Sequence, residues 1–297
     1  CSLVGSEMCI RDSTLSVKSQ EIFSVADIFT SHMVLQRNSK TKIWGTGKAR
    51  TSVKIKFAGR IYKTIINKDG KWMLDMDLKE YGGPYKLEVF NDYNTLCFDD
   101  VYIGDVWLAG GQSNMEFPLR RVKDSNIEIE KANYSKIRYY KVPRKFYKGH
   151  NVSKEDWKVC SKENASEMSA IAYYFSKDLF TELNIPIGII QVPVGGTTAE
   201  AWISRKTLSS DKEFQPIIQN YDSIVSSYSK DEYSKLYNQY NKLLDEYNQL
   251  DTDRKRYISK PVEPMGEWNF RRPSGVFENM LLPVCLLYTS PSPRDCS

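Results

Sequence analysis

The sequence predicts an α/β protein in which a β-rich region, residues 14–100, precedes an α/β region, residues 101–284. Two observations predict this order. Before residue 100, short segments alternate polar and apolar residues and are separated by glycine turns, the pattern of half-buried strands. After residue 100, an apolar run, a stretch of helical periodicity and a second apolar run follow one another. This alternation favours a parallel sheet covered by helices.

Evenly spaced short strands in the β-rich region predict a β-sandwich. The turn Asn67-Lys68-Asp69-Gly70 separates two alternating segments and predicts a β-hairpin. Such a domain could bind carbohydrate or support the second region structurally, and the sequence leaves both interpretations open. The expected strands cover residues 42–45, 52–59, 61–66, 71–78 and 83–90.

The α/β region contains two expected buried strands, residues 101–109 and 187–192, with a helix between them over residues 166–183. Ligands of parallel sheets lie at the carboxyl ends of the strands, so the residues that follow these two strands should face the same edge. A third segment, residues 211–258, carries a tyrosine and leucine stripe at helical spacing. We interpret that stripe as core packing rather than as a platform for sugar.

The first strand runs directly into Gly111-Gln112-Ser113-Asn114-Met115. A serine at a strand-to-helix turn exposes its hydroxyl and places its backbone N–H where an acyl-transfer enzyme needs an oxyanion donor. The alternative is a turn that only caps a helix. The segment matches neither the G-x-S-x-G elbow nor the phosphate loop of nucleotide-binding proteins.

The second strand runs into Gly195-Gly196-Thr197, where bare backbone N–H groups could approach a ligand. With this stretch in view, the chain resembles the sialate O-acetylesterase family, serine esterases of the SGNH-hydrolase superfamily. The resemblance implies a three-layer α/β/α domain after the β-sandwich. It lies in residues 33–37 and 43–45, 104–108 with 111–116, 195–197 with 200–202, and 278–283.

The resemblance implies that the chain is an esterase that hydrolyses acetyl esters of sugars. Ser113 would attack the acetyl carbonyl, and the backbone N–H groups of Ser113 and Gly196 would bind the oxyanion. Gly195 and Thr197 would support this turn. The alternative is a non-catalytic carbohydrate-binding protein that keeps a vestigial serine. Xylan, sialic acid and other acetylated glycans cannot be told apart by the sequence.

Four further residues have expected roles around the serine. Gln112 replaces the aspartate that many members of the wider superfamily place before the serine, and it should fix the turn by hydrogen bonding. Asn114 could do the same. Glu200 and Trp202 could contact sugar, although capping and packing explain these two residues equally well.

The two ends of the chain read as translated sequencing adapter. A single nucleotide sequence encodes residues 3–12, and its reverse complement encodes residues 286–294. We therefore expect residues 1–13 and 285–297 to be artefacts that contribute nothing to the fold. We also expect them to make few buried contacts.

The family places its catalytic histidine and aspartate in a D-x-x-H segment near the C-terminus and a further oxyanion asparagine after the 278–283 block. These groups would be absent here, and the fragment would have little activity. His32 is interpreted as a solvated loop residue, and His150 lies in a polar loop without the expected aspartate pattern. Neither is expected to replace the missing base.

The composition of the chain limits the classes of function that it could have. The chain has 42 basic and 37 acidic residues, but no dense basic run, so nucleic-acid binding is not expected. No apolar run is long enough to span a bilayer, and no metal or organic cofactor is implied. Cys97 and Cys160 are the cysteines outside the adapter-like ends, and the sequence does not show whether they pair. The family resemblance alone suggests a secreted, periplasmic or lysosomal protein.

Overall fold

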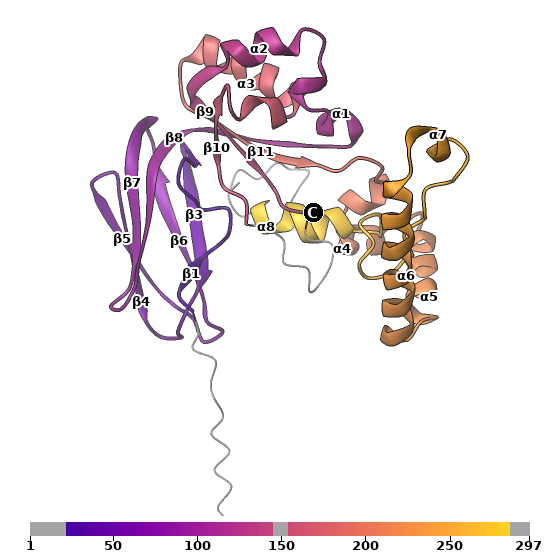
Figure 1. The fold of residues 1–297 in the computed structure, drawn as a ribbon. Coiled ribbons are helices and arrows are strands. Elements are labelled where there is room, and N and C mark those ends of the chain that lie inside the picture. Colours follow the sequence, from indigo (N-terminus) through magenta and orange to yellow (C-terminus); the bar gives the residue numbers. More distant parts are fainter. Residues whose placement is uncertain (1–21, 145–153, 286–297) are drawn as a thin grey trace, which may run out of the picture.

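The computed structural model describes residues 22–144 and 154–285, which form a mixed α/β fold with two sheets (Figure 1). The smaller sheet has the order β1-β3-β6, and the larger has the order β10-β9-β11-β8-β7-β4-β5, with β2 pairing β8 as well. The strands are β1 (Ser24–Val25), β2 (Val34–Gln36), β3 (Ser39–Thr46), β4 (Ser52–Phe57), β5 (Arg60–Ile65), β6 (Lys71–Leu78), β7 (Gly82–Phe90), β8 (Thr95–Gly111), β9 (Asn133–Lys141), β10 (Lys158–Ser161) and β11 (Ile187–Pro193).

Strand β8 belongs to both halves of the molecule. Its first part pairs antiparallel with β7, and its last part pairs parallel with β11, from Ile187 opposite Asp105 to Pro193 opposite Gly111. The strand is 17 residues long, about twice the run expected from the sequence. The predicted boundary between residues 100 and 101 therefore lies inside one continuous strand.

The two sheets of the first half share one apolar core. Every second residue of β6 is buried, as half-buried strands require. These side chains, among them Leu74 and Met76, belong to the same buried cluster as Ile55 of β4 and Val89 of β7. The strands expected from alternation are thus present, with ends that differ by a few residues.

For the predicted hairpin, the turn is confirmed but the pairing of its two strands is wrong. The turn forms, with Asn67 Oδ1 accepting hydrogen bonds from the backbone N–H groups of Asp69 at 3.0 Å and Lys71 at 2.9 Å. However, β5 and β6 do not pair along their lengths, because β6 pairs with β3 and β5 with β4. The turn instead carries the chain from one sheet to the other.

Helices cover both faces of the parallel part of the larger sheet. Ile187 and Ile189 of β11 pack with residues of α3 (Ala170–Leu183), whereas Ile190 and Val192 pack in the cluster that contains Met280 of η4 (Phe277–Leu281). In Figure 1, α3 and α8 (Leu282–Cys285) accordingly lie on opposite sides of β11.

Helix α3 begins four residues later than the sequence suggested. Residues Ala165–Glu167 form the short 3-10 helix η2, and Met168 is extended. The Ser169 hydroxyl then accepts a hydrogen bond from the backbone N–H of Ala172 and caps α3. The helix ends at Leu183, where Asn184 adopts a left-handed conformation before Pro186.

A helical arm stands beside the sheet (Figure 1). It contains α5 (Gln215–Ser226), α6 (Lys230–Gln249) and α7 (Thr252–Lys255). The tyrosine stripe of α6 is part buried and part exposed: Tyr233 is buried and packs against Trp268 with 4.8 Å between the ring centroids, whereas Leu243 is 44% exposed. The stripe therefore packs at its N-terminal end and reaches solvent further along.

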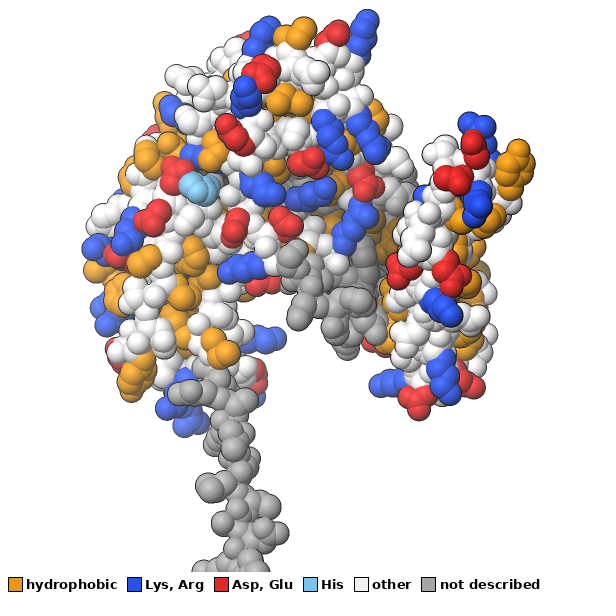
Figure 2. Space-filling model, in the orientation of Figure 1, with side chains coloured by type: hydrophobic (Ala, Val, Ile, Leu, Met, Phe, Trp, Pro, Cys, Tyr) orange, Lys and Arg blue, Asp and Glu red, His pale blue; other side chains and the backbone are white. Residues whose placement is uncertain are grey.

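Several properties of the described residues bear on the expectations from composition. Positive and negative side chains intermix over the face shown in Figure 2. Within the described ranges, no helix is both long and apolar enough to cross a membrane. Cys97 and Cys160 are free thiols, the first exposed and the second buried. Apart from Cys285, which ends α8, the two adapter-like ends lie outside the described residues.

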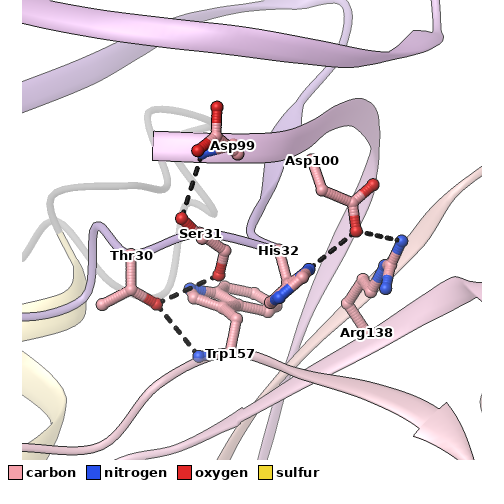
Figure 3. A network of polar contacts seen from close by, with 7 residues as sticks. All are labelled: Thr30, Ser31, His32, Asp99, Asp100, Arg138 and Trp157. Atoms are coloured by element: carbon pink, nitrogen blue, oxygen red, sulfur yellow. Dashed lines mark hydrogen bonds and ion pairs between the residues drawn. The ribbon is translucent and has the colours of Figure 1, made fainter. Parts of the chain in front are cut away.

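A bulge in β8 joins the two halves. Leu87 pairs with Phe98 but Tyr85 pairs with Val101, so β8 carries one extra residue there, and Asp100 has a left-handed backbone with φ of 56°. The Asp100 carboxylate accepts hydrogen bonds from His32 Nδ1 at 2.7 Å and from Arg138 Nη2 at 2.9 Å (Figure 3).

The ion pair between Asp100 and Arg138 matters for stability because Arg138 is almost fully buried, with 2% of its surface exposed. Its guanidinium also lies over the Tyr102 ring, 5.2 Å from the centroid. A buried cation without its anion is strongly destabilising. Asp100 therefore has two roles. It occupies the left-handed position of the bulge, and its carboxylate compensates the positive charge of Arg138 in β9.

We predict that Asp100→Asn lowers the free energy of unfolding by about 2 kcal/mol, because asparagine tolerates the left-handed backbone but leaves Arg138 unpaired. The exposed pair of Lys42 and Asp75, at 2.7 Å, provides the control. Asp75→Asn should change the stability by less than about 0.5 kcal/mol. Urea unfolding measures both, and equal effects would contradict the role given to Asp100.

Candidate active site

Two turns meet where β8 and β11 end. Because Gly111 pairs with Pro193 in parallel register, the residues after each strand leave the sheet side by side. The backbone N–H of Val194 then donates to the carbonyl of Gly111 at 2.9 Å, which extends the pairing into the turn. The sequence-predicted meeting of Ser113 with Gly195 and Gly196 at one sheet edge is thus what the structure contains.

Ser113 lies at the start of α1 (Ser113–Glu116) and is exposed. Its hydroxyl makes no hydrogen bond to any of the described residues. The helix is only four residues long and Phe117 after it is extended. A helix this short has almost no dipole, so individual backbone N–H groups supply the positive potential here.

Gly195 lies directly against Ser113. A β-carbon built on Gly195 would be 3.1 Å from Ser113 Oγ and 2.6 Å from Glu116 Oε2. The backbone N–H of Gly195 donates to that same Glu116 oxygen at 2.8 Å. Glycine at 195 is therefore what permits the two turns to approach, and Glu116 holds them together.

Arg144 completes this clamp from a third segment. Its Nη2 donates to Glu116 Oε1 and, at 3.2 Å, to the carbonyl of Pro193 at the end of β11. Glu116 thereby bridges the serine turn, the glycine turn and the residues after β9. Sequence reasoning gave neither Glu116 nor Arg144 a role. Glu116 was visible as the last residue of the serine block, but no sequence signal pointed to Arg144.

Gly196 is the residue of the second turn with a backbone N–H free to bind a ligand. Its φ of 73° is left-handed, a conformation that favours glycine. Unlike the N–H of Gly195, its N–H donates to none of the described residues. A donor of this kind beside an exposed serine hydroxyl is the arrangement that an oxyanion hole requires.

A second connection links the turns through Thr197. Gln112 Nε2 donates to the Thr197 carbonyl, so the side chain before the serine reaches across to the glycine turn. The Thr197 hydroxyl donates to the carbonyl of Val194 at 2.9 Å and accepts from Trp202 Nε1 at 2.8 Å. The half-buried Trp202 thus braces the turn, and its ring packs against the core.

Unlike Gln112 and Trp202, Asn114 and Glu200 do not brace the two turns with their side chains. Asn114 is exposed, and its side chain hydrogen-bonds to none of the described residues. Glu200, in η3 (Ala199–Trp202), is half-buried and accepts a hydrogen bond at its carbonyl from the backbone N–H of Ser274 at 2.8 Å. Its side chain lines a cavity of about 380 Å³ together with Tyr221 and Arg271.

His32 lies far from Ser113. Its backbone N–H donates to the carbonyl of Asp99, and its ring Nδ1 donates to the Asp100 carboxylate, so His32 lies beside β8 near Asp100. At about 3.3 Å per residue, the strand from there to Gly111 separates the two side chains by at least about 20 Å. His32 is a half-exposed turn residue with a carboxylate partner. His150 lies outside the described residues.

Glu263 lies in the segment that leads to Arg271. Burial raises the pKa of Glu263 to about 7, and the charge of Arg271 and a hydrogen bond from Tyr237 oppose this increase. Burial is the larger effect because the carboxyl faces the aromatic stripe of α6. No sequence pattern singled out Glu263 or Arg271.

A larger cavity, of about 760 Å³, lies away from the serine, between the smaller sheet and α8. Trp44, Trp72 and Tyr140 line it, and none of its walls carries a group of the Ser113 turn. Within the described part of the chain, no cluster of three or more metal-ligating side chains occurs.

The part of the chain that contains the two turns is similar to known proteins. The family described as "Carbohydrate esterase, sialic acid-specific acetylesterase" matches residues 103–238, which include both turns. The sialate O-acetylesterase of Mus musculus is 29% identical over 210 residues, covering 63% of this chain and 39% of that protein. The sialate O-acetylesterase of Homo sapiens is 30% identical over 210 residues, with 63% and 40% covered.

Among solved structures, a carbohydrate acetylesterase from Xanthomonas citri superposes with a TM-score of 0.59 at 32% sequence identity. The alignment covers 65% of this chain and 45% of that one. The chain therefore spans about two fifths of the length of the curated relatives it matches, with 39% and 40% covered.

We predict that Glu263→Gln stabilises the protein above pH 7 and not at pH 4. A carboxyl whose pKa is raised on folding, here from 4.5 to about 7, stabilises the fold fully below pH 4.5 and loses that contribution as the pH rises through 7. Because Glu263 is partly exposed, we expect a gain of about 1 kcal/mol at pH 8.

Thermal unfolding at the two pH values measures this difference. Glu246→Gln, at an exposed position on α6, is the control and should show no such pH dependence. A Glu263→Gln variant with the same stability difference at both pH values would contradict the assignment of the raised pKa.

Proposed function

We propose that this chain, which matches the family of sialic acid-specific acetylesterases over residues 103–238, forms the serine-bearing part of an enzyme that removes acetyl groups from sugars. The observation that carries the proposal is the contact between Ser113 and Gly195. It places an exposed hydroxyl beside a turn whose next backbone N–H, that of Gly196, has no partner among the described residues. The substrate is an O-acetylated carbohydrate.

In the proposed reaction, the Ser113 hydroxyl attacks the acetyl carbonyl and loses its proton to a general base. The carbonyl oxygen becomes an oxyanion, which the N–H groups of Ser113 and Gly196 bind. Collapse of this intermediate expels the sugar alcohol and leaves an acetyl-enzyme, and water then releases acetate. Glu116 and Gln112 position the two turns without touching the reacting atoms.

His32, the one histidine among the described residues, is remote from Ser113 and is not the base of the proposed reaction. The family resemblance assigns the base, its aspartate and a third oxyanion donor to a later part of the chain. We accordingly propose that the 297-residue polypeptide has little esterase activity by itself. The β-sandwich and the SGNH-type three-layer arrangement, like a secreted, periplasmic or lysosomal location, stay predictions.

We predict that Ser113→Ala lowers kcat for acetyl-ester hydrolysis by at least about 10³-fold in the full-length protein, because it removes the nucleophile. KM should change little, since the hydroxyl contributes little to ground-state binding. Release of acetate from an O-acetylated sugar measures the rate. Ser226→Ala on α5, an exposed serine far along the helical arm, is the matched control and should keep full activity. Unchanged turnover in Ser113→Ala would refute the proposed function.

A further inference from the structure

The carboxylate of Glu116 lies next to the proposed nucleophile. A β-carbon built on Gly195 would be 3.1 Å from Ser113 Oγ and 2.6 Å from Glu116 Oε2. Because both oxygens lie this close to one point, they are at most about 6 Å apart, a range over which charges interact strongly. The carbonyl carbon of a reacting ester bonds to Ser113 Oγ directly, so the oxyanion forms near a side chain that is itself negative.

A second anion beside the oxyanion opposes the proposed reaction. Like charges repel most strongly where water is partly excluded, and this repulsion raises the barrier to forming the oxyanion. The Glu116 side chain is 37% exposed, so water screens its charge only in part. A cation bound to Glu116 would remove the conflict and let the carboxylate stay in place.

Arg144 is the cation that binds Glu116 among the described residues. Its Nη2 donates to Glu116 Oε1, and the same nitrogen donates to the carbonyl of Pro193 at 3.2 Å. The other carboxylate oxygen, Oε2, accepts from the backbone N–H of Gly195 at 2.8 Å. One oxygen of Glu116 thus holds the glycine turn while the other binds the compensating charge.

The sheet places Arg144 at this position. The backbone N–H of Val142 donates to the carbonyl of Gln191 at 2.9 Å, which continues the parallel pairing of β9 with β11. Two residues further along both segments, the Arg144 side chain donates to the carbonyl of Pro193. The pairing beside β11 therefore fixes where this side chain begins, and the Pro193 carbonyl helps to fix where it ends.

Arg271 also lies near the glycine turn, but it does not bind Glu116. Its Nη2 would be 3.3 Å from a β-carbon built on Gly196. The charge of Arg271 acts on the half-buried Glu263, where it opposes the larger effect of burial on the pKa of that carboxyl. Compensation of Glu116 within the described ranges therefore depends on Arg144.

We propose that Arg144 is a positioning residue that compensates the charge of Glu116, so that this carboxylate holds the glycine turn without opposing the oxyanion. The inference rests on the proposed function and adds a requirement for charge balance at the same site. Arg144 acts through Glu116 and touches no reacting atom.

The test is a set of charge variants of the full-length protein, assayed by release of acetate from an O-acetylated sugar. Arg144→Gln should lower kcat by roughly 10- to 100-fold with little change in KM, because Glu116 then opposes the oxyanion. Adding Glu116→Gln should raise kcat again by at least about fivefold, since the amide is neutral and its oxygen still accepts from Gly195. Arg144→Lys keeps the charge and should stay within about threefold of the unchanged protein.

Arg205→Gln is the matched control. Arg205 pairs with Asp222 at 2.6 Å, and the two side chains are 42% and 52% exposed, against 47% and 37% for Arg144 and Glu116. This variant should keep full activity. A double variant no faster than Arg144→Gln would overturn the proposal, because a purely structural role of Arg144 predicts no rescue. An unchanged kcat in Arg144→Gln would overturn it as well.

Failure of the proposed function itself would look different, because the unchanged protein would then release no acetate. Hydrogen exchange, measured by mass spectrometry, still tests the positioning role. In Arg144→Gln, Glu116 is free to leave Gly195, so the peptide that contains residues 194–197 should exchange at least about threefold faster. Exchange equal to that of the unchanged protein would exclude a role for Arg144 in holding the turn.

Discussion

The parallel pairing of β8 with β11 is the constraint on which the candidate site depends. It ends with Gly111 opposite Pro193, so the serine turn and the glycine turn must leave the sheet as neighbours. A shift of the register by one residue would turn every side chain of β11 to the other face and exchange the residues that pack in the two buried clusters. The two apolar clusters on either face of β11 therefore fix the position of the site as well as the fold.

The same strand transmits the packing of the first half to the site. Residues of β7 and β2 hold the first part of β8, and the bulge at Asp100 redirects the strand before its parallel part begins. Arg138 of β9 and His32 of the first half both bind Asp100, which ties the two halves at the bend. The β-rich region is thus physically continuous with the sheet that presents Ser113.

Sequence patterns predicted what depends on local periodicity and on strand ends. They located most strands of the β-rich region, the helix before Pro186 and the meeting of Ser113 with Gly196. They missed the length of β8, because a bulge interrupts its alternation at Asp100. They also missed Arg144 and Arg271, which approach the site from distant segments through tertiary packing. No local pattern records which surface arginine lies beside a glycine turn.

The central claim is that the hydroxyl at the β8–β11 edge is the reactive group. The most direct measurement is to treat the active full-length protein with a fluorophosphonate, which modifies activated serines, and to locate the adduct by mass spectrometry of its peptides. The account predicts a single phosphonylated residue, Ser113, formed in step with loss of esterase activity. Loss of activity with the adduct on another residue, while Ser113 stays unmodified, would contradict it.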